Sequence, residues 1–239
     1  MNRNRAGLVA LFGVALVALA AEPAAAQGAP STTRNLIWGL NMDLLYVAVP
    51  ITVLVEGILI YTVWRFKNSG EAKPTRENRR LEITWTVATA VILLFVGVAS
   101  FGVLAKPHVT ASAGDSVDDA VHVEVVATTW QWSFNYNDTG TGDNRVSTTT
   151  TLTVPANRTI ELDVTSNRWI HSFHVPQLGL KQDAIPGQHH TLRTRITEPG
   201  TYQLYCAEYC GVGHSSMLGQ VRVLPQDEYQ DWLANQTGQ

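Results

Sequence analysis

The densest group of metal-binding side chains lies in the C-terminal half of the chain. Its members are, in order, His171, Cys206, Cys210, His214 and Met217. Cysteine, histidine and methionine are soft or borderline donors that suit copper better than calcium or magnesium. A single-copper site of the blue-copper type needs one cysteine, two histidines and a weak axial methionine. This group therefore contains one cysteine more than such a site requires.

The second cysteine leaves three interpretations open. A Cys206–Cys210 disulfide would suit an exported domain, although so short a loop would stabilise the fold little in the chain-entropy description. A zinc site is the second interpretation, but methionine is a poor zinc ligand. The third is a centre of two copper ions, in which both thiolates bridge the metals and His171 and His214 complete one copper each. The spacing favours the copper pair.

A signal peptide is predicted at residues 1–26. Arg3 and Arg5 precede an apolar run from Gly7 to Ala21, and small residues end at Ala26. This order is typical of a secretory signal that is removed by cleavage. A retained signal anchor is the alternative.

Residues 27–106 predict a transmembrane hairpin. Two apolar segments, at about 43–66 and 83–104, are long enough to cross a bilayer. The loop between them carries six basic residues, which mark the cytoplasmic side. Both ends of the hairpin would then lie on the outer side of the membrane. Glu56 falls inside the first helix, where an ionisable group is costly and usually faces protein.

Residues 107–225 predict an all-β sandwich or barrel, because short strand-like runs alternate with Gly, Pro and Asn. The predicted strands are Val121–Thr128, Trp130–Tyr136, Ser147–Val154, Thr159–Thr165, His190–Ile196, Thr201–Cys206 and Leu218–Leu224. In the tail, residues 226–239, a short amphipathic helix is expected at Gln226–Leu233.

The net charge and the number of cysteines exclude two classes of protein. With 17 basic and 20 acidic side chains in 239 residues, the net charge of −3 argues against a nucleic-acid binder. Only two cysteines are present, which excludes a disulfide scaffold. From Asp115 to Leu224 the sequence has 11 acidic and 7 basic side chains, a balance of −4. A mildly acidic outer domain would favour a basic soluble partner, and a merely soluble surface is the alternative.

The motifs around the metal-binding residues resemble those of subunit 2 of cytochrome c oxidase. They are Trp130–Tyr136, His171–Gly187 and Cys206–Met217, and the resemblance covers about residues 36–224. The pattern Cys-x-Glu-x-Cys-x3-His-x2-Met is highly specific. The resemblance implies an N-terminal two-helix transmembrane hairpin followed by an all-β, cupredoxin-like Greek-key sandwich.

The resemblance also implies the metal ligands. In the two-copper CuA centre, Cys206 and Cys210 would bridge the metals, His171 and Met217 would bind one copper, and His214 and the backbone carbonyl of Glu208 would bind the other. The Glu208 carboxylate would reach a magnesium or manganese ion shared with subunit 1. His174 is an alternative ligand, but the family's ligand stands immediately before Ser-Phe, which favours His171.

Two further roles follow from the same resemblance. Trp130 would be the point at which electrons from the donor enter, although Trp130 and Trp132 could both be core aromatics. Glu82 would lie at the mouth of the K proton pathway of subunit 1. The alternative for Glu82 is a carboxylate favoured by the helix macrodipole.

The resemblance thus implies the CuA subunit of a haem–copper terminal oxidase in a prokaryotic cell membrane, with the β domain on the outer face. It would accept electrons from a cytochrome c or a small copper protein. It would pass them to haem a of subunit 1, for oxygen reduction coupled to proton pumping, with subunit 3 as a further partner. A membrane-anchored cupredoxin and a metal-free quinol oxidase subunit 2 are the alternatives.

Overall fold

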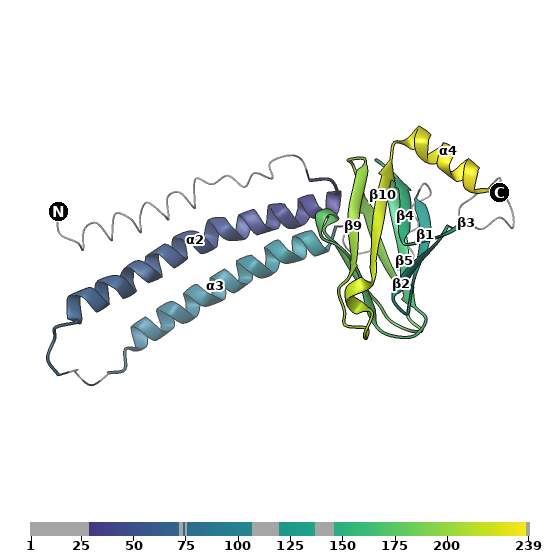
Figure 1. The fold of residues 1–239 in the computed structure, drawn as a ribbon. Helices are drawn as coiled ribbons and strands as arrows, with labels where there is room; N and C mark the ends of the chain where they lie inside the picture. The colour runs from purple at the N-terminus through teal and green to yellow at the C-terminus, as the bar shows by residue number, and fades with distance from the viewer. Residues whose placement is uncertain (1–28, 72–73, 75, 107–119, 137–145, 238–239) are drawn as a thin grey trace, which may run out of the picture.

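The computed structural model describes residues 29–71, 74, 76–106, 120–136 and 146–237. The predicted signal peptide lies outside these residues. The described chain consists of a pair of long helices and a β-sandwich, with a short helix near the C-terminus (Figure 1).

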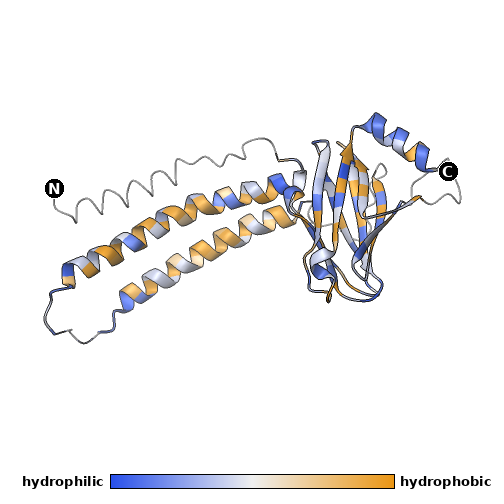
Figure 2. Ribbon diagram, in the orientation of Figure 1, coloured by the Kyte–Doolittle hydropathy of each residue, from blue (hydrophilic) through white to orange (hydrophobic). Residues whose placement is uncertain are grey.

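The two long helices, α2 (Thr32–Phe66) and α3 (Arg79–Leu104), run side by side away from the sandwich (Figure 1). Both are hydrophobic along most of their length (Figure 2), and both are long and apolar enough to cross a membrane. Each begins with a side-chain cap: Ser31 accepts from the Arg34 amide and Asn78 from the Leu81 amide. Such caps satisfy amides that would otherwise have no helical partner.

The helix α2 starts well before the segment predicted from hydropathy. Its first turns are polar and pack on the sandwich, so an apolar pattern could not reveal them. The Ser31 hydroxyl donates to the Leu178 carbonyl at 2.5 Å, and the Thr33 and Thr194 hydroxyls are 3.0 Å apart. These bonds attach the start of the hairpin to the β domain.

The sandwich has two five-stranded sheets. The first has the order β3-β2-β1-β5-β8, formed by Val146–Thr149, Gln131–Tyr136, Val121–Thr128, Thr159–Ser166 and His190–Arg195. The second has the order β4-β10-β9-β6-β7, formed by Thr151–Pro155, Leu218–Leu224, Gly200–Cys206, His171–Val175 and Leu180–Ala184. The sheets enclose a core in which Trp132, Phe134, Phe173 and Leu204 are fully buried. The hairpin followed by a two-sheet β-sandwich is the architecture predicted from the sequence.

The prediction of a single strand over Ser147–Val154 is wrong. The chain turns at Thr150, whose φ is 68°, and β3 and β4 belong to different sheets. Corners of this kind let a strand switch sheets. The Thr150 amide donates to the Trp132 carbonyl and its own carbonyl accepts from the Gln220 amide, so both sheets fix the corner.

The hairpin of β6 (His171–Val175) and β7 (Leu180–Ala184) was not predicted from the sequence. The buried β6 lacks a polar and apolar alternation, which is the signal that reveals half-buried strands. A short 3-10 turn, η1 (Pro176–Leu178), and Gly179 at φ 66° connect the two strands. The terminal helix α4 (Gln226–Thr237) extends past the predicted end, and its Trp232 packs against Tyr136.

Candidate metal centre

The candidate ligands lie on the loop between β9 and β10 and at the start of β6. The Cys206 amide donates to the Met217 carbonyl at 3.2 Å, which closes the loop at its base. The Ala207 amide donates to the Ser172 carbonyl at 2.9 Å and holds the loop beside β6. A short 3-10 turn, η2 (His214–Ser216), completes the loop. Backbone bonds therefore position the side chains of His171, Cys206 and Met217 together.

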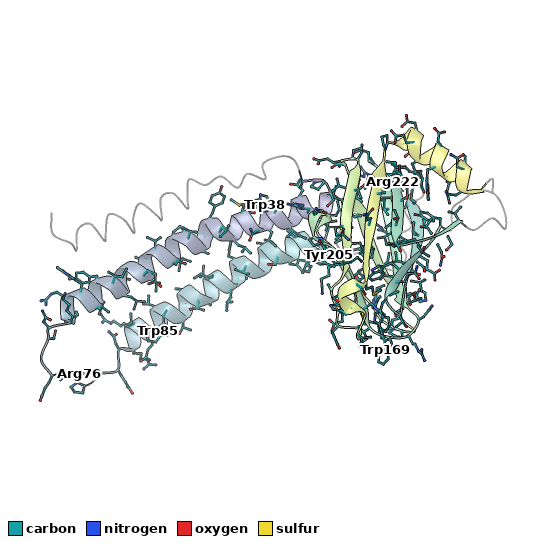
Figure 3. The ribbon with its side chains drawn as sticks, viewed as in Figure 1. Trp38, Arg76, Trp85, Trp169, Tyr205 and Arg222 are labelled. Atoms are coloured by element: carbon teal, nitrogen blue, oxygen red, sulfur yellow. The ribbon has the colours of Figure 1, made fainter. Side chains whose placement is uncertain are left out.

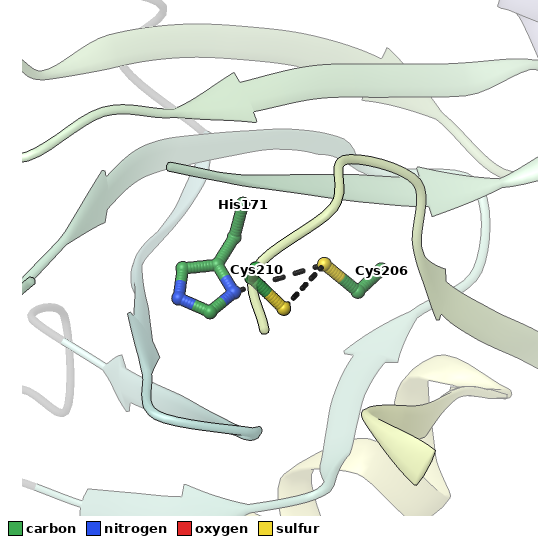
Figure 4. Close-up of side chains that lie close together, drawn as sticks. All are labelled: His171, Cys206 and Cys210. Carbon is green, nitrogen blue, oxygen red and sulfur yellow. Dashed lines mark hydrogen bonds between the residues drawn. The ribbon is translucent and has the colours of Figure 1, made fainter. Parts of the chain in front are cut away.

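The donor atoms of His171, Cys206 and Cys210 converge in a buried cluster (Figure 4), which we call the metal pocket. The sulfur atoms of Cys206 and Cys210 are 3.8 Å apart. The His171 Nδ1 atom lies 3.7 Å from the Cys206 sulfur and 3.1 Å from the Met217 sulfur. The His214 Nδ1 atom lies 3.6 Å from the Cys210 sulfur. The structure thus brings all five of these side chains together.

These separations fit a metal of the copper or zinc type. Ligands at about 2.0–2.3 Å from one tetrahedral ion lie roughly 3.3–3.8 Å apart, and the sulfur–sulfur and cysteine–histidine separations match this spacing. Both cysteines are free, and 3.8 Å far exceeds the disulfide bond length of about 2.05 Å. The pocket therefore contains two thiols, and its soft donor set favours copper.

Glu208 contributes its backbone to the pocket and its side chain to the surface. The Cys206 thiol donates to the Glu208 carbonyl at 3.3 Å. The residue itself is exposed, so its carboxylate is accessible to a group outside the pocket. The two roles expected for Glu208 therefore fall on different parts of one residue.

Burial favours the neutral forms of Cys210 and His171. Burial, together with the neighbouring Cys206, raises the pKa of the Cys210 thiol to about 11. Burial and then the nearby His214 lower the pKa of His171. A thiol must lose its proton to bind a metal, so metal binding here releases protons.

His171, and not His174, faces the pocket. The two residues are three apart on β6, and side chains an odd number apart on a strand point to opposite faces. The His174 Nδ1 atom lies 3.0 Å from the Leu180 carbonyl, on the neighbouring strand. The His171 ring has its Nδ1 atom beside the cysteine and methionine sulfurs. Its second nitrogen, Nε2, is buried and has no hydrogen-bond partner among the described residues.

Trp130 lies between solvent and the ligand loop. It is in the turn between β1 and β2 with φ 66°, whereas the sequence predicted it at the start of a strand. Its indole Nε1 donates to the Cys210 carbonyl at 3.2 Å. Trp130 is 37% exposed, whereas Trp132 is fully buried. Of these two tryptophans, Trp130 is therefore the one that reaches the surface.

Gly213 allows Trp130 to pack against the ligand loop. Its role was not predicted from the sequence. A Cβ atom there would lie 2.2 Å from the Trp130 ring, so no larger residue fits without moving the indole. The signal in the sequence was a Gly-x-Gly pair, Gly211 and Gly213, directly after a candidate ligand.

Glu82 lies far from the pocket. It is in the first turn of α3, at the end of the hairpin remote from the sandwich, near the labelled Trp85 (Figure 3). Its backbone carbonyl accepts from the Thr86 hydroxyl at 2.8 Å, and its side chain is exposed. The structure therefore leaves Glu82 at the opposite end of the molecule from the metal ligands.

Comparison with known families and proteins matches both parts of the chain. The family model "Cytochrome C oxidase subunit II, transmembrane domain" matches residues 22–103, and "Cytochrome C oxidase subunit II, periplasmic domain" matches residues 140–223. The chain is 32% identical to cytochrome c oxidase subunit 2 of Cereibacter sphaeroides, covering 89% of this chain and 80% of that protein. It is 30% identical to the probable subunit 2 of Rickettsia prowazekii, covering 80% and 65%.

The solved structures to which the chain is similar include a subunit II domain and a mutant of amicyanin. The periplasmic domain of subunit II of cytochrome oxidase from Bradyrhizobium japonicum has a TM-score of 0.47 at 24% identity, covering 54% of this chain and 98% of that one. A mutant of amicyanin has a TM-score of 0.28 at 17% identity, covering 47% and 90%.

Proposed function

The chain belongs to the cytochrome c oxidase subunit II family, and we propose that it is the CuA subunit, which accepts electrons from an external donor. The observation that carries the proposal is the convergence of two thiols, the buried His171 and Met217 side chains and the half-buried His214 imidazole. A metal-free quinol oxidase subunit would not require this set of metal ligands.

The residues fit a pair of copper ions. Twice a metal–sulfur distance of about 2.3 Å exceeds the 3.8 Å between the cysteine sulfurs, so both sulfurs can contact the same ion. Cys206 and Cys210 would hold both copper ions, His171 and Met217 would complete one of them, and His214 with the Glu208 carbonyl would complete the other. When bound, the pair supplies a one-electron carrier. The backbone hydrogen bonds that close the ligand loop at its base and join it to β6 would limit the movement of the ligands during each transfer.

The exposed Glu208 carboxylate is placed for a second metal. It binds magnesium or manganese at the contact with subunit 1, because hard carboxylate oxygens suit those ions. Its carbonyl and carboxylate then lie between the copper pocket and subunit 1. Electrons pass from the pocket to haem a of subunit 1, where oxygen is reduced and protons are pumped.

The hairpin decides on which side of the membrane the metal pocket lies. The basic loop between α2 and α3 lies on the cytoplasmic side, so the sandwich lies on the outer face of a prokaryotic cell membrane. Glu82, at the cytoplasmic end, is then available at the mouth of the proton pathway of subunit 1. The apolar surfaces of the hairpin contact subunit 1, with subunit 3 completing the complex, and the signal peptide is cleaved after Ala26.

A matched pair of histidine variants tests the proposal. His171→Gln should lose bound copper and donor-driven reduction of haem a in the purified complex. His174→Gln should keep both, because that side chain faces a backbone carbonyl. Retained copper in His171→Gln, or lost copper in His174→Gln, would contradict the ligand assignment. A membrane-anchored cupredoxin with no oxidase partner would bind copper but would not copurify with haem.

A further inference from the structure

One carboxylate lies inside the first membrane-spanning helix. Glu56 stands 13 residues after the start of the apolar segment at 43–66 and ten residues before its end. At about 1.5 Å per residue, these separations are roughly 20 and 15 Å, so Glu56 lies near the middle of a bilayer core about 30 Å thick. An ionisable side chain at this depth is costly and usually faces protein or a water-filled cavity, so it marks a functional site.

The neighbouring helix α3 does not cover Glu56. In the half of the hairpin nearer the sandwich (Figure 1), α3 is half-buried at Ile92 and Val103. Towards the loop that joins the two helices, every residue of 50–66 and 79–91 is exposed. Glu56 lies in this uncovered part of α2, so its side chain is accessible to another chain in the membrane.

The described part of the chain supplies no partner for this carboxylate. Glu56 makes no ion pair or hydrogen bond with the described residues. The nearest basic residue along α2 is Arg65, nine residues away, and its guanidinium lies over the Phe66 ring, 5.4 Å from the ring centre. The helix α3 carries no charged residue from Ile83 to Leu104. Compensation for the carboxylate therefore has to come from another chain.

The face of α2 around Glu56 presents hydrogen-bond acceptors. Thr52 lies one turn before Glu56 on the same face, and its hydroxyl donates to the Ala48 carbonyl at 2.9 Å. Because that proton is used, the Thr52 oxygen can only accept a hydrogen bond from a partner, as a carboxylate does. Gly57, the next residue after Glu56, has open space where a Cβ would lie, and small residues let a second helix approach closely.

We propose that the face of α2 formed by Thr52 and Glu56 binds a transmembrane helix of a partner subunit, and that this helix places a basic side chain against the Glu56 carboxylate. The inference rests on the proposed function, which supplies the membrane partner in subunit 1. A basic side chain offers N–H donors to both acceptors and also compensates the negative charge. A neutral donor would satisfy the hydrogen bonds but would leave that charge uncompensated in the bilayer.

Copurification from membranes tests the proposal. The full chain is expressed with the other oxidase subunits and isolated through a tag in mild detergent, and the haem retained per chain is measured. Glu56→Leu should lower the retained haem by about tenfold, because a buried cation of the partner loses its counter-charge. Leucine makes α2 more apolar, so failure to insert into the membrane would not explain the loss. Copper bound per chain should stay unchanged, since the metal pocket lies in the sandwich.

Two matched pairs of variants separate charge from shape. Glu56→Gln keeps the shape but removes the charge, so it should also lose haem, whereas Glu77→Gln removes the same charge in the exposed loop and should retain it. Thr52→Val should weaken retention about threefold, because it removes one acceptor. Thr62→Val should not: its hydroxyl likewise donates within α2, to the Ile58 carbonyl at 2.7 Å, but Thr62 lies about 120° around the helix from Glu56.

Three results would overturn the proposal. Full haem retention in Glu56→Leu would show that the carboxylate faces lipid or water. Loss in Glu56→Leu with full retention in Glu56→Gln would show that the partner is a neutral donor, and equal losses in Glu56→Gln and Glu77→Gln would show that position does not matter. Failure of the proposed function differs from all three, because the unsubstituted chain would then lack copper or would retain no haem.

Discussion

The indole Nε1 of Trp130 donates a hydrogen bond to the backbone carbonyl of Cys210 at 3.2 Å. One partner is a surface side chain and the other belongs to a buried residue whose sulfur lies in the metal pocket. The ring also packs against Gly211 and Gly213 of the same loop. A single side chain therefore connects the solvent, the metal-ligand loop and the candidate metal centre.

Replacing Trp130 with Phe should slow electron acceptance and preserve the copper spectrum. Phenylalanine keeps a ring on the loop but loses the N–H donor and part of the conjugated path. The measurement is the rate of copper reduction by a protein donor in stopped flow, beside the absorption spectrum of the copper centre. An unchanged rate would remove Trp130 from the electron path.

Gly213→Ala should displace the Trp130 indole. The added Cβ would lie 2.2–2.8 Å from three ring atoms, and overpacking of this kind costs about 1–3 kcal/mol. The measurement is tryptophan fluorescence together with the rate of copper reduction, and both should change.

Gly211→Ala is the control for that variant. There the added Cβ would be 3.6 Å from the indole, so contact is tolerated, but φ of 111° makes the backbone unfavourable for alanine. It should lower stability and leave the indole in place. The same fluorescence change in both variants would contradict the close approach at Gly213.

Tyr136→Phe should destabilise the sandwich. The Tyr136 hydroxyl donates to the Thr153 carbonyl at 3.0 Å and accepts from the Thr153 amide at 2.8 Å. Losing both bonds leaves two buried backbone groups without this partner, at a cost of about 1–3 kcal/mol. Chemical denaturation measures the loss. Tyr202→Phe, which removes a single exposed bond to Glu198, should cost less, and an equal cost would contradict the argument.

Stability should also fall at alkaline pH. Burial raises the pKa of Tyr136 above its ordinary value of about 10. Because the folded pKa is higher than the unfolded one, this stabilisation is complete below pH 10 and is lost as the pH rises further. Tyr136→Phe should reduce the alkaline loss without abolishing it, since burial also raises the pKa of Tyr202. An identical pH profile in the variant would contradict this assignment.

The sequence predicted the elements whose signal is local. The motif from Cys206 to Met217 identified four candidate ligands because they lie on one loop, and hydropathy revealed the apolar parts of both helices. The corner at Thr150 and the polar start of α2 depend on packing against distant strands, so no local pattern revealed them. The positive φ of Trp130 and its approach to Gly213 are likewise tertiary features.

Thr33→Val should loosen the attachment of the hairpin to the sandwich. Thr33 and Thr194 are both buried, and their hydroxyls are 3.0 Å apart. Valine deprives the Thr194 hydroxyl of this partner, which costs about 1–3 kcal/mol when the group is buried. Thermal unfolding of the full chain measures the effect. Thr33→Ser keeps the hydroxyl and should be nearly neutral, so equal losses in the two variants would rule out the hydrogen bond as the cause.

The copper content and electron paramagnetic resonance spectrum of the full chain test the central claim most directly. The chain in detergent is reconstituted with copper, and the bound metal is counted. The account predicts two coppers per chain and a mixed-valence signal in which one unpaired electron is shared over two copper nuclei. One copper per chain with a single-copper signal would contradict it.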